Sequence, residues 1–225
     1  LRIMKGIYKE QWDIGTIISE AWNLFRTNFK EIIFITLMIY VPLNLIVGLF
    51  PLGTDGLGGS PTGHPAVLIA TSLVGLIGTA AIAIFVKSKV DKKKIDYKKA
   101  LKLGINRWPA LLGTTLLQAL FLILLTLALV VPAIIFGVYW MFAIYAVVLS
   151  GKVGKGALDY SKSIVKGRWW TVLGYSLVLG LISGVFTMPI TYLSSLLPIQ
   201  WWNIVLTYTL IQIVSAFILV AGVVM

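Results

Sequence analysis

The sequence predicts an all-α membrane protein with six spanning helices, paired as three hairpins, each preceded by an amphipathic helix in the membrane interface. Hydrophobic residues make up 59% of the 225 positions and charged residues only 12%, about half the charged share of a soluble domain. The apolar residues occur in uncharged runs as long as a bilayer-crossing helix, which needs about 20 residues. All 19 Lys and Arg residues fall in three segments, separated by segments that contain none.

Two apolar runs form the first predicted hairpin. Residues 32–50 make one span and residues 65–86 a second. Between them, residues 51–65 contain five glycines and three prolines, a composition typical of an irregular loop. Because a backbone inside a bilayer must satisfy its own hydrogen bonds, runs this apolar are expected as helices rather than barrel strands.

Two longer uncharged runs form the other hairpins. Residues 109–149 are too long for one span and long enough for two, with a tight turn expected near residues 129–132. Residues 169–225 likewise hold two spans and are expected to turn at residues 189–200. The six spans make one integral membrane domain over residues 1–225.

The basic residues predict the orientation. Five precede the first span, nine lie between spans two and three, and five lie between spans four and five. The opposite connections contain no Lys or Arg, only Asp55 and His64. The positive-inside rule therefore places both termini and both basic connections in the cytoplasm, as expected for a multi-pass plasma-membrane protein. The mixed charge before the first span does not match a secretory signal peptide.

The three basic segments share a pattern that predicts an internal repeat. Each has apolar residues on one helical face and polar residues on the other, as in helices that lie in the membrane interface, and Asp13 is expected to cap the first of them. We align the segments on Phe29, Trp108 and Trp169. Small residues then lie eight positions earlier and aliphatic residues five positions earlier: Ala21, Ala100 and Ser161; Leu24, Leu103 and Ile164. The predicted units are residues 13–86, 96–149 and 155–225; alternatively, any junction between interface and span has these features.

The junction "VKGRWW" at residues 165–170 is the clearest of the three. Gly167 is expected to let the interfacial helix break, and Arg168 to keep its charge among the lipid head groups. Trp169 and Trp170 are expected at the membrane boundary, where span five begins. Phe29 and Trp108 take the equivalent place in the other two units.

Residues 131–175 resemble a membrane domain carried by some bacterial glycerophosphoryl diester phosphodiesterases and by stand-alone membrane proteins of the same family, mostly of unknown function. The shared features are a proline-led aromatic helix, a small-residue turn, an Ala-Leu-x-x-Ser helix and a Gly-Arg-aromatic-Trp junction: Pro132, Trp140, Gly151, Ala157, Leu158, Ser161, Gly167, Arg168 and Trp170. "AWNLFRTNF" is similar to the family's first amphipathic segment, whereas Ser150 replaces an acidic residue that members often have. The resemblance implies the fold but not the phosphodiesterase chemistry, which needs paired histidines and carboxylates on a metal.

The residue types present predict no enzyme chemistry. The chain has no Cys and a single His, so thiolate chemistry is excluded, and His64 is expected to be an ordinary loop residue because a metal site needs three or four ligands. No charged residue lies in the middle of a predicted span, unlike in ion-coupled transporters or intramembrane hydrolases. We therefore expect no catalytic residue, no metal and no cofactor. An enzyme acting on lipid head groups would require Glu20, Asp96 and Asp159 to converge.

Polar residues within the spans are candidates for lining a cavity: Asn44, Gln118, Tyr139, Tyr145 and Gln212. Prolines in or near these spans could open such a cavity in discontinuous helices, as in transporters. The alternative is simple kinks, with the polar groups used in hydrogen bonds between helices. Gly180 and Gly184 form a small-residue face that predicts a close helix contact.

Basic residues near two of the junctions are candidates for binding anionic lipid head groups: Lys87, Lys89, Lys92, Lys93, Lys94, Lys98, Lys99, Lys102, Arg107, Lys166 and Arg168. Each is expected to contribute about 1 kcal/mol near the surface, although determining topology would also explain them. Nucleic acid is not an expected partner, because Trp22 and Trp108 lie on interfacial faces. The leading prediction is a non-enzymatic scaffold or accessory module that contacts anionic phospholipid, a partner protein or a second copy. The alternative is a small transporter or channel for an apolar, amphipathic or peptide-like substrate.

Overall fold

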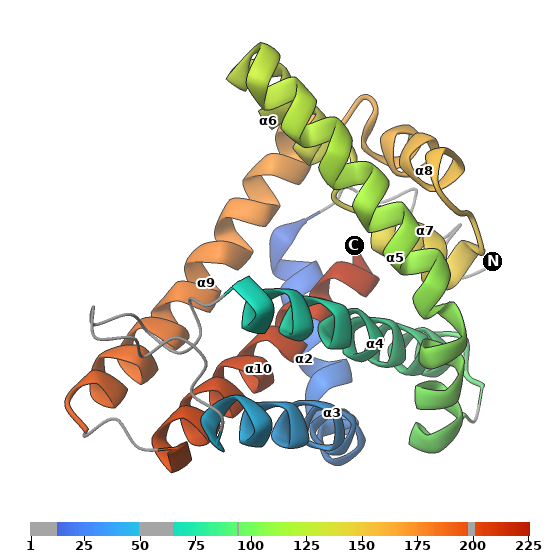
Figure 1. Cartoon of the computed structure of the whole chain (residues 1–225). Helices are drawn as coiled ribbons and strands as arrows, with labels where there is room; N and C mark the ends of the chain where they lie inside the picture. The colour runs from blue at the N-terminus through green and yellow to red at the C-terminus, as the bar shows by residue number, and fades with distance from the viewer. Residues whose placement is uncertain (1–12, 50–64, 94, 198–200) are drawn as a thin grey trace.

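The computed structural model describes residues 13–49, 65–93, 95–197 and 201–225, and this part of the chain is all-α (Figure 1). It contains helices and no strand among those residues: α2 (Ile14–Thr27), α3 (Phe29–Leu49), α4 (Pro65–Val90), α5 (Tyr97–Ala128), α6 (Val130–Tyr139), α7 (Ala143–Ser150), α8 (Lys155–Val165), α9 (Trp169–Ser195) and α10 (Trp201–Val224). By length and composition, six helical segments of the described residues can cross a membrane, counting α6 with α7 as one. The predicted all-α, six-span fold is therefore confirmed.

The hairpin boundaries follow the apolar runs closely. Helix α5 ends at Ala128 and α6 begins at Val130, so this turn lies where it was predicted. The last turn differs, because α9 continues through Pro189 to Ser195. A proline inside a helix removes one backbone donor and need not end a membrane helix. Residues 198–200 of that turn, and residues 50–64 of the first predicted loop, lie outside the described residues.

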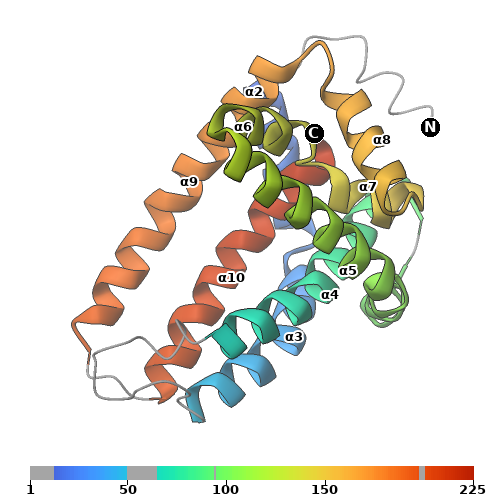
Figure 2. The same ribbon diagram turned by 45° about the horizontal axis from the view of Figure 1, so that its top comes forward.

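The main core lies among α2, α3, α4 and α10. Its fully buried side chains include Ala21, Ile32, Phe85 and Val220. Helix α9 runs beside α10, and α5 packs on α4 at its N-terminal end, whereas its C-terminal end and α6 extend away from this core (Figures 1 and 2). Many apolar side chains on α5 and α9 are consequently exposed, as expected for surfaces that face lipid.

Two of the three predicted amphipathic helices are separate elements, namely α2 and α8. Asn28 ends α2, with its Nδ2 donating to the Leu24 carbonyl at 2.9 Å. Gly167 follows α8 in the left-handed conformation, with φ +85°, as expected of a residue that breaks the helix. The second predicted amphipathic helix differs, because residues 97–108 continue into the span as the first third of α5. No residue there has a positive φ, and Gly104 packs against the α4 backbone at Ile77 and Ala81.

Span four is divided into α6 and α7 by a turn at residues 140–142, which the sequence analysis did not predict. Ser161 of α8 stabilises this turn. Its Oγ donates to the Tyr139 carbonyl at 2.7 Å and accepts from the Phe142 N–H at 3.1 Å. Ser161 has no exposed surface, so the turn's polar backbone groups are satisfied out of contact with solvent.

The predicted units share two kinds of contact. The aligned small residues Ala21, Ala100 and Ser161 are each 0% exposed. The aligned tryptophans each donate an indole N–H to the preceding span: Trp108 to the Leu73 carbonyl at 2.8 Å, and Trp169 to the Ile135 carbonyl at 3.1 Å. The repeat itself stays a prediction, and these matched contacts agree with it.

Candidate functional site

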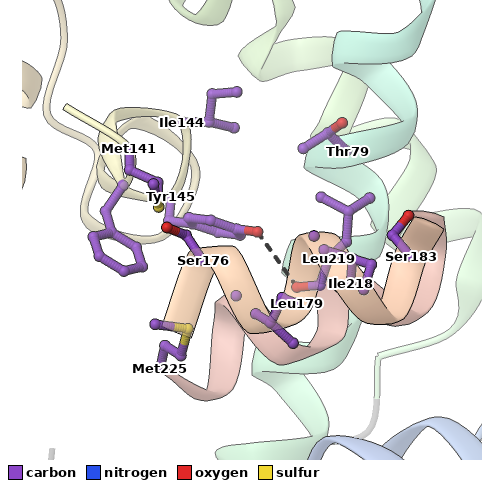
Figure 3. Close-up of a pocket in the computed structure, with 13 residues that line it drawn as sticks. Thr79, Met141, Ile144, Tyr145, Ser176, Leu179, Ser183, Ile218, Leu219 and Met225 are labelled. Carbon is purple, nitrogen blue, oxygen red and sulfur yellow. Dashed lines mark hydrogen bonds between the residues drawn. The ribbon is translucent and has the colours of Figure 1, made fainter. Parts of the chain in front are cut away.

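A pocket of about 370 Å³ lies where the three hairpins meet, between α4, α7, α9 and α10 (Figure 3). Its walls are almost entirely apolar, and it is partly open rather than enclosed. The residues that line it are Thr79, Met141, Phe142, Ile144, Tyr145, Ser176, Leu179, Gly180, Ser183, Ile218, Leu219, Gly222 and Met225. No Asp, Glu, Lys, Arg or His is among them, so none of these lining side chains is charged.

Tyr145 crosses the pocket from α7 to α10. Its Oη donates to the Leu219 carbonyl at 3.4 Å, and Figure 3 shows the ring pointing toward that helix. The contact depends on Gly222, because a Cβ at that position would lie 2.2 Å from Tyr145 Oη. Glycine is therefore required by the close approach of the tyrosine rather than by its own backbone conformation. Of the five polar cavity candidates, Tyr145 is the one that lines this pocket.

Besides Tyr145, three residues of the pocket carry a hydroxyl group, namely Thr79, Ser176 and Ser183, and the first two bond within their own helices. Thr79 Oγ1 donates to the Gly75 carbonyl at 3.0 Å, and Ser176 Oγ donates to the Leu173 carbonyl at 2.8 Å. Both bonds lie within the residue's own helix, and they occupy the hydroxyl proton that a ligand would otherwise receive. The pocket is therefore suited to hydrocarbon rather than to a polar solute.

The remaining cavity candidates do not gather at one place. Asn44 is buried and donates from Nδ2 to Thr209 Oγ1 at 3.2 Å, which joins α3 to α10. Gln118 donates from Nε2 to the Trp140 carbonyl at 3.4 Å. Tyr139 lies under the Lys162 ammonium, with its carbonyl bonded to Ser161, and Gln212 is half-buried on α10. Asn44 and Gln118 thus agree with the alternative prediction, in which polar side chains of the spans form hydrogen bonds between different segments of the bundle.

A polar network joins α9 to α10 near their connection. Ser194 Oγ donates to Asn203 Oδ1 at 3.0 Å, and Thr207 Oγ1 donates to Ser194 Oγ at 2.8 Å. Asn203 Nδ2 also donates to the Ser194 carbonyl at 3.1 Å. These satisfied bonds fix one end of the helix pair that forms a wall of the pocket.

Gly180 and Gly184 do not make the predicted close helix contact. Among the described residues, no atom lies within 4 Å of the position that a Cβ would take at either glycine. Among the described residues, close approaches occur instead at Gly104, against the α4 backbone, and at Gly78 and Gly222, against tyrosine side chains. Sequence spacing identified a small-residue face on α9, but α9 and α10 do not pack through it.

The basic candidates lie mostly on exposed surface. Lys92, Lys93, Lys98, Lys99, Lys102, Arg107 and Lys166 are exposed, whereas Lys87, Lys89 and Arg168 are half-buried. Lys94 lies outside the described residues. Within the described ranges one ion pair is found, between Lys87 and Asp91 at 3.3 Å.

Arg107 brings the second and third basic segments together. Its guanidinium lies about 3.5 Å from the position a Cβ of Gly151 would take. Gly151 caps the C-terminus of α7 with φ +68°, and a helix C-terminus carries partial negative charge that favours a nearby cation. The basic residues of α5 therefore lie close to the connection that leads into α8.

The aromatic junction residues begin spans as expected. Phe29 is the first residue of α3 and is 47% exposed, and Trp169 is the first residue of α9. Trp170 is 79% exposed, and its ring meets that of Trp169 edge-on at 4.7 Å. Trp108 differs, because it lies inside the continuous helix α5.

The acidic residues form no metal-binding group in the described part of the chain, where no set of three His, Cys, Asp or Glu side chains converges. Asp13 caps α2 by accepting from the Thr16 N–H at 3.3 Å, and Asp96 caps α5 by accepting from the Tyr97 N–H at 2.8 Å. Glu20 and Asp159 are exposed. Asp55 and His64 lie outside the described residues.

A family model described as Domain of unknown function (DUF7847) matches residues 101–225, which is more than half of the chain. The match includes α6 to α10 and therefore most of the pocket. No curated protein and no solved structure matches the chain. The resemblance to the membrane domain of glycerophosphoryl diester phosphodiesterases stays a prediction, because the family description names no activity.

Proposed function

We propose a function from the geometry of the structure, because the chain belongs to the family described as Domain of unknown function (DUF7847) and that description names no activity. The proposal is a non-catalytic, multi-pass protein of the plasma membrane whose basic cytoplasmic face binds anionic phospholipid head groups. The observation that carries it is the run of exposed basic side chains on and just before α5, next to the α7–α8 connection. Arg107 belongs to the first of these segments, and its guanidinium lies beside Gly151 at the start of the second.

Five charges on this face have no acidic partner among the described residues. Lys92, Lys93, Lys98, Lys99 and Lys102 are exposed, and no carboxylate lies at ion-pair distance from them among the residues described. The positive-inside rule by itself would be satisfied by basic residues at any position in these connections. Their position at the ends of apolar helices supports contact with phospholipid phosphates, for which each charge near the surface would contribute about 1 kcal/mol.

Substitution of three lysines on one helix tests the proposal. Lys98, Lys99 and Lys102 are exposed on the first turns of α5, and glutamine is a comparable helix former. Together they should contribute about 3 kcal/mol, or roughly 100-fold in affinity. The thermal midpoint of the purified protein in neutral detergent would be followed during titration with phosphatidylglycerol or phosphatidylcholine.

We expect phosphatidylglycerol, but not phosphatidylcholine, to raise the midpoint of the wild-type protein. The variant Lys98→Gln, Lys99→Gln, Lys102→Gln should need far more phosphatidylglycerol, and the matched variant with arginine at the three positions should behave as wild type. Added salt should weaken the effect, because it screens exposed charges. Equal responses to the two lipids, or an unchanged response of the glutamine variant, would overturn the proposal.

A second candidate function is transport of an apolar or amphipathic substrate, and the pocket between the hairpins favours it. Its uncharged lining suits such a substrate and not an ion. The test is substrate-dependent flux in reconstituted vesicles, with a dansyl-labelled fatty amine as probe. Flux no faster than in protein-free vesicles would reject this candidate.

A further inference from the structure

Two walls of the pocket come from α9 and α10, and the space between them is called the slot. From α9 it receives Ser176, Leu179, Gly180 and Ser183, and from α10 it receives Ile218, Leu219, Gly222 and Met225. Each set lies on one helical face and covers about two turns, or roughly 10 Å at 1.5 Å per residue. We propose that this slot binds a single hydrocarbon chain of a membrane amphiphile.

The volume favours a single chain over larger occupants. About 370 Å³ is near the lower end for ligand pockets, which span roughly 300–1,000 Å³. A partner helix is about 10–12 Å across, so a 10 Å length of it would fill roughly 800 Å³. A helix of a second copy or of a partner protein would therefore need about twice the volume of the slot.

The chemistry of the walls favours hydrocarbon over water. A buried water needs two to four polar partners, whereas the hydroxyls of Thr79 and Ser176 already donate to their own helices. Met141 and Met225 also line the pocket. Methionine is flexible and polarizable, so these side chains can adapt to chains of different shape.

Gly180 gives this inference a direct test. It lines the pocket, and no described atom lies within 4 Å of the position that its Cβ would take. Its φ is not left-handed, so a larger side chain there should enter the slot without backbone strain. Gly184 lies one turn further along α9, has the same open surroundings and does not line the pocket. Gly184→Leu is therefore a matched control for Gly180→Leu.

The probe is hexadecanol that carries a diazirine near the chain end, added to the full chain in phosphatidylcholine nanodiscs. After irradiation, the labelled peptides are mapped by mass spectrometry, with unlabelled hexadecanol as competitor. We expect saturable label on 176–183 and 218–225, reduced at least tenfold by Gly180→Leu and unchanged by Gly184→Leu. The exposed face of α5 at Leu116, Leu120 and Leu124 should show only label that competitor does not remove, as expected of general lipid contact.

The result would overturn the inference if label spread over all lipid-exposed helices without competition, or if both glycine variants labelled alike. Circular dichroism would confirm that both variants are folded, and Gly180→Ala provides a smaller obstruction if the leucine variant is not. The inference rests on the proposed membrane location but not on head-group binding, since the probe is uncharged. The variant with glutamine at Lys98, Lys99 and Lys102 should therefore label as wild type, so that either proposal can fail without the other.

Discussion

Replacement of Ser161 by alanine is the most direct test of how the divided fourth span is held together. The Ser161 hydroxyl donates to the Tyr139 carbonyl at 2.7 Å and accepts from the Phe142 N–H at 3.1 Å, and the side chain has no exposed surface. Alanine occupies the aligned positions Ala21 and Ala100, which are equally buried, so the substitution should cause no overlap. Its effect should come from the two lost hydrogen bonds.

The expected cost follows from the two backbone groups left without a partner. A buried polar group that loses its partner costs about 1–3 kcal/mol, so the loss of both bonds in Ser161→Ala should destabilise the protein by about 2–6 kcal/mol. The free energy of unfolding would be measured by titrating the micelle-bound protein with sodium dodecyl sulfate, followed by far-ultraviolet circular dichroism. Amide exchange at Phe142 should accelerate roughly tenfold for each 1.4 kcal/mol of lost local stability.

A serine on the same helix provides the control. Ser163 is exposed, and its Oγ donates to the Tyr160 carbonyl of its own helix at 2.7 Å. Ser163→Ala should therefore change the free energy of unfolding by less than about 0.5 kcal/mol. An equally small effect of Ser161→Ala, with unchanged exchange at Phe142, would show that the turn does not depend on α8.

The other predictions concern two glycines. Gly222→Ala would place a Cβ 2.2 Å from Tyr145 Oη, so it should destabilise the protein by about 1–3 kcal/mol, measured by the same titration. Tyr145→Phe should relieve part of that cost, since the ring Cζ would still lie 2.8 Å from the added Cβ, and fully additive effects in the double variant would contradict the contact. Gly167→Leu should cost about 1–2 kcal/mol, because φ is +85° there. The neighbouring Arg168→Lys should change stability by less than about 0.5 kcal/mol, and a large effect would mean that Arg168 has a role beyond its charge.

Local chemistry determined the elements that the sequence predicted correctly. A run such as residues 32–50 crosses a bilayer because of its length and lack of charge, whatever its neighbours are. Asp13 caps α2 through the N–H of Thr16, only three residues away. Gly167 ends the preceding helix because glycine adopts a positive φ without steric cost.

Contacts between distant segments decided the features that the sequence did not predict. Residues 97–108 continue through Pro109 into α5, because Gly104 packs against α4 and no residue there takes a positive φ, although their polar pattern resembles that of α2. The turn within span four depends on Ser161, about 20 residues later. One signal of this role was present in the sequence, since serine replaces the alanine of the other two predicted units.

The candidate site likewise combines features set by local sequence with features set by contacts between distant segments. The sequence by itself determined that the spans would be helical, apolar and uncharged, because hydrophobicity is a property of each segment. Only the tertiary structure decided that Tyr145 would meet Gly222 in a pocket while Asn44 and Gln212 would lie outside it. Which side chains converge depends on the rotation and tilt of each helix, and these are set by packing between helices rather than by the composition of any one of them.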